Sequence, residues 1–82
     1  MGRKEKLLRR AKESPNNFRF TDLIKLAEHH GFAISRQKGS HVMMIHEEES
    51  LFMNFQERNG EAKPYQVKQL TQVIEENNLQ DT

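Results

Sequence analysis

Apolar residues in the first third of the chain recur with the period of an α-helix. Residues 4–13 and 19–30 each collect apolar side chains on one side and charged side chains on the other, which predicts two amphipathic helices. Between them, Ser14-Pro15 and the two asparagines that follow predict a turn. Either Asn17 or Thr21 can cap the second helix, and Gly31 is expected to end it in a left-handed conformation.

The pattern changes to alternation at Phe32, which is typical of β-strands. The expected strands and turns are, in chain order, strand 32–36, turn 38–40, strand 41–46, turn 47–50 and strand 51–56. Because the connections are short, the strands are expected to form an antiparallel meander. A loop over 57–63 then leads to Pro64, a favourable first residue for a last helix over 64–77.

This order of elements, helix-helix-strand-strand-strand-helix, predicts an α+β fold. We expect a two-layer sandwich in which a three-stranded antiparallel sheet carries the helices on one face. Residues 1–82 are expected to form a single domain, with a basic helical extension at 1–17, a core at 18–79 and a polar tail at 80–82. One face or edge of such a sheet stays open to a partner.

Length and composition narrow the kind of site and its location. A chain of 82 residues buries a small core, so a shallow surface site is expected rather than a deep cleft. The absence of cysteine excludes disulfides, a thiolate nucleophile and cysteine-based zinc sites. The chain begins with charged residues, and no apolar run reaches the length of a membrane span, so the cytoplasm is the expected location, with no membrane partner.

Charge is distributed unevenly along the chain. Residues 1–38 contain ten Lys and Arg against four Asp and Glu, a net charge of +6, whereas residues 39–82 contain three against eight, a net charge of −5. A basic half suits a polyanion such as nucleic acid, because Lys and Arg displace the counterions of phosphates. The basic face of the first helix consists of Arg3, Lys6, Arg10 and Lys12. That face either follows phosphates or is simply solvated.

The segment 36–41 reads Arg-Gln-Lys-Gly-Ser-His and joins two expected strands. It resembles the signature of the HicA toxin family. Segments 22–26 and 30–32 resemble the first core helix of that family and its following turn, and 62–70 resembles the start of the last helix in one branch. The resemblance spans about residues 20–79, and the N-terminal helix is an addition that only some members have.

Membership of that family implies a fold similar to a double-stranded RNA-binding domain. It also implies ribonuclease activity on single-stranded messenger RNA without a metal or other cofactor, and neutralisation by a HicB-type antitoxin. By position, His41 matches the catalytic histidine of the family, and Gly39 and Ser40 match its flanking motif. Lys38 and Arg36 match basic positions of the family, and RNA binding is expected at Arg36, Lys38, Gly39 and Ser40.

Histidine suits this chemistry because RNA carries its own nucleophile, the 2′-OH. Cleavage then needs help only with proton transfer and with charge on the phosphate. The ordinary pKa of a histidine, about 6.5, leaves both protonation states available at cellular pH.

The three acidic residues at 47–49 depart from the family pattern, which has proline or basic residues at these positions.

Other candidate groups have simpler interpretations. His46 follows His41 by five positions in the same expected strand, so the two point to opposite faces, which argues against a shared metal ion. His29 and His30 fall in the last turn of the second helix and are expected to be helix-end residues rather than metal ligands. Phe52 either stacks on a base or is covered by a partner.

Three functions compete at this point. The first is a ribonuclease toxin, and the second is a non-catalytic RNA-binding module of the same fold. The third is a DNA-binding regulator that uses the two N-terminal helices, which is disfavoured because the second helix offers few base-reading residues beyond Arg19 and Lys25. Cleavage products separate the first two, because a nuclease releases defined fragments and a binding module only shifts the RNA band.

Overall fold

The computed structural model describes residues 3–79 of the chain. The elements are, in order, α1 (Arg3–Glu13), a single 3₁₀ turn η1 (Pro15–Asn17), α2 (Phe20–His29), β1 (Ala33–Lys38), β2 (His41–His46), β3 (Leu51–Arg58), β4 (Glu61–Ala62) and α3 (Pro64–Glu76). The polar tail at 80–82 and the side chain of Arg3, which was expected on the basic face of α1, lie outside this description. The α+β fold and the order of the helices are as predicted.

The sheet is antiparallel and has four strands in the order β1-β2-β3-β4, so the expectation of three strands is wrong. Asn59 and Gly60 both have positive φ angles, 53° and 81°, the requirement of a two-residue hairpin turn, and they fold the chain back on β3. The short strand is held from its other side as well, because Phe20 N donates to the Gly60 carbonyl and Ala62 N donates to the Phe18 carbonyl.

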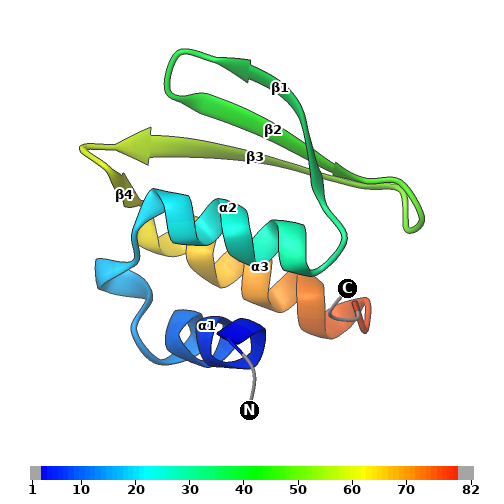
Figure 1. Cartoon of the computed structure of the whole chain (residues 1–82), viewed down its shortest axis with the longest axis horizontal. Coiled ribbons are helices and arrows are strands. Elements are labelled where there is room, and N and C mark those ends of the chain that lie inside the picture. Colours follow the sequence, from blue (N-terminus) through cyan, green and yellow to red (C-terminus); the bar gives the residue numbers. More distant parts are fainter. Residues whose placement is uncertain (1–2, 80–82) are drawn as a thin grey trace.

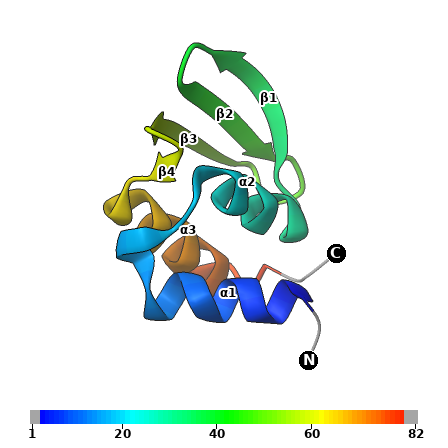
Figure 2. The ribbon, with the colours of Figure 1, turned by 60° about the vertical axis from the view of Figure 1, so that its left-hand side comes forward.

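All three helices lie on one face of the sheet (Figures 1 and 2). The buried apolar side chains come from the helices, from β2, β3 and β4 and from the connecting segments: Ala11, Phe18, Phe20, Leu23, Leu26, Ala27, Phe32, Val42, Met44, Met53, Phe55, Ala62, Val67, Leu70, Ile74 and Leu79. The six residues of β1 are all exposed. No helix within residues 3–79 has the length and apolar character that crossing a membrane requires.

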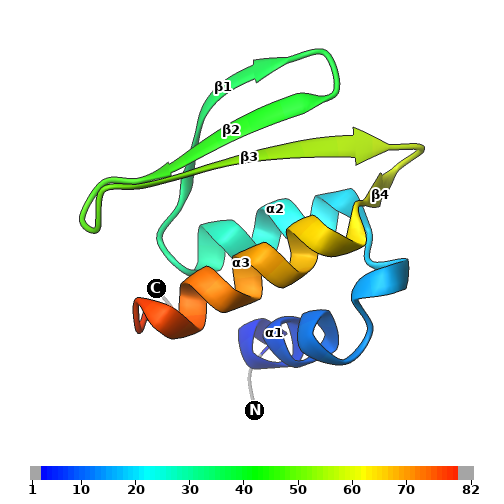
Figure 3. The ribbon, with the colours of Figure 1, turned by 180° about the vertical axis from the view of Figure 1, so that it is seen from behind.

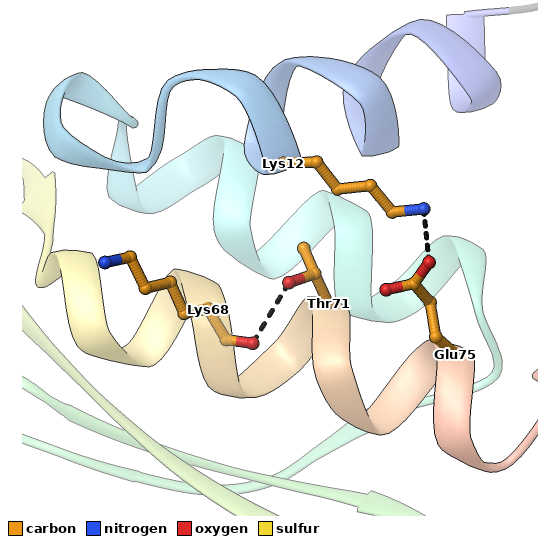
Figure 4. A network of polar contacts seen from close by, with 4 residues as sticks. All are labelled: Lys12, Lys68, Thr71 and Glu75. Atoms are coloured by element: carbon orange, nitrogen blue, oxygen red, sulfur yellow. Dashed lines mark hydrogen bonds and ion pairs between the residues drawn. The ribbon is translucent and has the colours of Figure 1, made fainter.

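Helix α1 packs on α2 and α3, on the side of these helices that faces away from the sheet (Figures 1 and 3). Arg10 forms an ion pair with Asp22 of α2, and its guanidinium carbon lies 5.1 Å from the centre of the Phe18 ring. Lys12 Nζ lies 2.6 Å from a carboxylate oxygen of Glu75 in α3 (Figure 4). Two of the basic residues that could have followed phosphates therefore attach α1 to the core.

Figure 4 also shows how a buried polar group on α3 is satisfied, since the Thr71 hydroxyl donates to the Lys68 carbonyl at 3.0 Å. At the start of α2, neither Asn17 nor Thr21 is the cap. The N-cap residue is Arg19, which makes no capping hydrogen bond with its side chain. The pairing of Phe20 N with Gly60 instead satisfies one of the amides at this helix end.

The C-terminal end of α2 is closed by a contact between Gly31 and His46 of β2. Gly31 has a φ angle of 96°, as predicted, and a Cβ atom built on it would lie 2.4 Å from His46 Nε2. The imidazole of His46 is buried, meets the Phe32 ring edge-on at 5.3 Å between centroids, and accepts a hydrogen bond from Glu49 N. His46 is thus a packing residue on the helix side of β2.

Replacing Gly31 by alanine is expected to lower the free energy of unfolding by about 2–4 kcal/mol, because the new methyl group meets His46 and the positive φ is strained. Gly60→Ala is the matched control, since Gly60 also has a positive φ but no atom lies within 4 Å of an added Cβ. There we expect a loss of about 1 kcal/mol. Equal losses for the two variants in urea denaturation would show that the His46 contact is unimportant.

Candidate functional site

The end of the β1–β2 hairpin and the adjoining part of β3 enclose an open hollow of about 610 Å³ on the surface. The hollow, called here the first hollow, is lined by Arg36, Lys38, Gly39, Ser40, His41, Met43 and Asn54. All five residues that the sequence singled out therefore lie together. Met43 and Asn54 were not singled out for this site, although strand alternation would place both on the same face as His41 once the register was known.

We call the side of the sheet that faces away from the helices the open face. The site residues of β2 lie on it because side chains alternate between the two faces of a strand. Val42 and Met44 are buried toward the helices, so His41 and Met43 point to the open face. Residues paired directly across an antiparallel ladder share a face. Lys38, which pairs with His41, is thereby placed beside it.

A one-residue shift of register in β1 brings Arg36 to the same face. Ile34 pairs with Met44, but Arg36 pairs with Met43, so the ladder gains one residue between them. Without this bulge the pairing would continue from Ile34 to set Arg36 opposite Val42, on the helix side. The bulge therefore puts both basic residues of β1 on the face that carries His41.

A chain of polar contacts reaches the first hollow from the start of α3. Lys63 Nζ donates to Gln56 Oε1 at 2.5 Å, and Gln56 Nε2 lies 3.5 Å from the hydroxyl oxygen of Ser40. Gln56 is also the β3 residue that pairs with His41. The carbonyl of Ser40 accepts a hydrogen bond from Glu57 N at 2.9 Å, which fixes the turn on β3.

Gln56 and Lys63 were missed by the sequence reasoning. Gln56 could have been found by counting the register outward from the β1–β2 turn, whereas nothing in the local sequence connects Lys63 with Gln56. Lys63 adds a third basic residue close to the hollow that Arg36 and Lys38 line, because it bonds to Gln56 and Gln56 lies near Ser40. The three glutamates at 47–49 lie at the opposite end of β2 from His41.

Gln66 of α3 holds the edge of β3 next to this site. Its side chain is buried; its Nε2 donates to the Asn54 carbonyl at 3.1 Å, and its Oε1 accepts from Gln56 N at 2.9 Å. One carboxamide thus takes the place of a neighbouring strand where β4, which pairs only with Glu57 and Arg58, does not reach. The β3 residues that adjoin the first hollow are held in position by this bond pair.

The arrangement offers an exposed imidazole, two cationic side chains and a hydroxyl around one open hollow. Arg and Lys at such a surface can bind a phosphate, and an imidazole beside them can exchange protons with a bound group. Among residues 3–79, no three His, Asp or Glu side chains are grouped as metal ligands would be. His30, expected at a helix end, is buried with Nδ1 2.9 Å from the Leu26 carbonyl.

Comparison with known proteins decides the family. Residues 20–77 match the family model described as the HicA toxin of bacterial toxin-antitoxin systems. The chain belongs to the HicA toxin family. The match runs from the start of α2 to the end of α3 and leaves α1 outside it. Searches of curated proteins and of solved structures returned no match to this chain.

As a HicA family member, the chain is the toxin of a toxin-antitoxin system, and its cognate partner is an antitoxin. The fold described above is the double-stranded-RNA-binding-domain-like fold of that family, with a fourth short strand and with α1 added outside the helical layer. The predicted α+β fold class and the resemblance to the HicA toxin family are therefore both confirmed.

The Gln66→Leu variant is expected to lose about 2–4 kcal/mol of unfolding free energy, because it leaves the Asn54 carbonyl and the Gln56 amide without their partner. Gln69→Leu, an exposed change on the same helix, is the control and should shift stability by less than about 0.5 kcal/mol. Urea denaturation measures both, and amide exchange should be faster at Gln56 in the first variant alone. Indistinguishable unfolding curves would contradict the assigned role.

Proposed function

We propose that this HicA toxin is an endoribonuclease that cuts messenger RNA, with His41 as its general acid and base. The observation that carries the proposal is the first hollow, where His41 lies exposed beside Arg36 and Lys38 on a surface that the helices leave uncovered. We further propose that the activity needs no cofactor, that it takes place in the cytoplasm and that a HicB-type antitoxin silences it.

The reaction uses a nucleophile that belongs to the substrate. The neutral imidazole of His41 accepts the proton of the ribose 2′-OH while the 2′-oxygen attacks the adjacent phosphorus. The bond between phosphorus and the 5′-oxygen then breaks, and the imidazolium returns a proton to that oxygen. The products are one fragment that ends in a 2′,3′-cyclic phosphate and one that begins with a 5′-OH, so that atoms and protons balance.

The residues around His41 have roles that follow from their chemistry. Arg36 and Lys38 bind the scissile phosphate and stabilise the negative charge that grows on it in the transition state. Gly39 carries no side chain that would keep a phosphate from the backbone, and the hydroxyl of Ser40 is a hydrogen-bond donor for a phosphate oxygen. An open hollow of this kind admits an extended single strand, whose bases and backbone are both accessible.

His41→Ala is expected to lower kcat/KM for cleavage of a single-stranded RNA by at least about 100-fold, because a positioned general acid or base contributes roughly 10²–10⁴-fold. The exposed residue Gln37 lies on the same hairpin and outside the hollow, so Gln37→Ala serves as the control and should cut normally. Circular dichroism establishes that both variants are folded.

Binding separates a chemical role for His41 from a loss of substrate affinity. The Kd of His41→Ala for the same RNA should stay within a few-fold of the native value, since Arg36 and Lys38 remain in place. Full cleavage by His41→Ala would refute the assignment. A native chain that binds RNA but never cuts it would instead favour a non-catalytic RNA-binding module.

A further inference from the structure

A second hollow of about 520 Å³ lies beside the first, between β3 and α3. It is lined by Phe52, Met53, Asn54, Gln69, Gln72, Val73 and Glu76. Strand β3 runs over α3 in the views of Figures 1 and 3, and the hollow lies between these two elements. Asn54 lines both hollows, so the two are neighbours on one continuous surface.

The two hollows differ in chemistry. The first contains Arg36 and Lys38, whereas the lining of the second includes neither lysine nor arginine and has Glu76 as its charged residue. The carboxylate of Glu76 accepts a hydrogen bond from Gln72 Nε2 at 2.6 Å. A phosphate would find no cationic partner there, so the second hollow does not extend the phosphate-binding surface.

The second hollow instead has the groups that bind an unpaired base. Phe52 keeps 57% of its surface exposed, and the carboxamides of Asn54, Gln69 and Gln72 line the same hollow. Aromatic side chains on the exposed face of a sheet stack with unpaired bases, and carboxamides offer a donor and an acceptor to a base edge.

The position of Phe52 fits a nucleotide that lies near the one that is cut, further along the same strand. Phe52 and Gln56 point to the same face of β3, four residues apart, which is about 14 Å along a strand. Gln56 pairs with His41, so an extended RNA strand can reach from the first hollow to the second. The acidic turn at 47–50 lies just beyond Phe52 and repels phosphates, which sets an end to the RNA path.

We propose that Phe52 and Asn54 form a base-binding subsite for the RNA that His41 cuts. One unpaired base, a short way along the strand from the scissile phosphate, stacks on the Phe52 ring, and the carboxamides of Asn54 and Gln69 bind its edge. This subsite gives the toxin a preference for the base at one position. The inference rests on the proposed ribonuclease function and adds a contact between the toxin and a base of its RNA substrate.

The experiment is a double-mutant cycle between Phe52 and the bases of a short single-stranded RNA. In the His41→Ala background, which binds RNA without cutting it, each nucleotide is replaced in turn by an abasic one and the Kd is measured by fluorescence anisotropy. At one position, loss of the base should weaken binding roughly 5- to 100-fold when Phe52 is present. The same substitution should cost little once Phe52→Ala has been introduced, because the stacking partner is gone.

Two further variants serve as controls. Phe52→Trp should preserve binding, since the larger ring still stacks, and Tyr65→Ala should have no effect, because Tyr65 is an equally exposed aromatic residue outside both hollows. Additive losses from Phe52→Ala and from base removal at every position would overturn the subsite. So would a Phe52→Ala variant that binds RNA normally but binds the antitoxin weakly, since Phe52 would then be a protein contact. Neither result affects the His41 assignment, which depends on cleavage.

Discussion

The one-residue bulge in β1 is the constraint on which the site depends. Before the bulge, Ile34 pairs with Met44, which faces the helices. After the bulge, Arg36 pairs with Met43, which faces away from them. A sheet has a period of two, so a shift by one residue exchanges every side chain beyond it between the faces. Arg36 and Lys38 thereby share the open face with His41, whereas without the shift Arg36 would lie opposite Val42 on the helix side. The proposed chemistry requires that juxtaposition of cations and imidazole.

The rest of the fold keeps that surface open and stiff. Helices α2 and α3 cover one face of the sheet only, and α1 lies beyond them (Figure 1). Helix α1 is held there by the ion pair of Arg10 with Asp22 and by that of Lys12 with Glu75, which Figure 4 shows. Gln66 hydrogen-bonds two backbone groups at the β3 edge, and through Gln56 that edge is connected to Ser40 and Lys63. The basic N-terminal helix is therefore separated from the His41 surface by the helical layer, so its charge does not make one continuous patch with the site.

The period of apolar residues predicted most helix and strand boundaries to within two residues of those in the structure, because it depends on which side of each element is buried. It also placed His41 and His46 on opposite faces, and the five proposed site residues share one hollow. Three features of the structure were not predicted from the sequence. The bulge near Ser35 has no glycine or proline to mark it, and β4 is too short for a periodic pattern. Lys63 contacts Gln56 because of the way the chain turns from β4 into α3. The local sequence does not predict the direction of that turn, so this contact could not be predicted either.

The proposed reaction requires that the 2′-OH of the RNA is the nucleophile and that His41 is its proton acceptor. The most direct test incubates the chain with single-stranded RNA in EDTA and determines the ends of the fragments. The account predicts 2′,3′-cyclic phosphate and 5′-OH ends, and no cut where a 2′-deoxynucleotide replaces the nucleotide before the scissile bond. Fragments with 5′-phosphate ends, or cleavage after the deoxynucleotide, would contradict it.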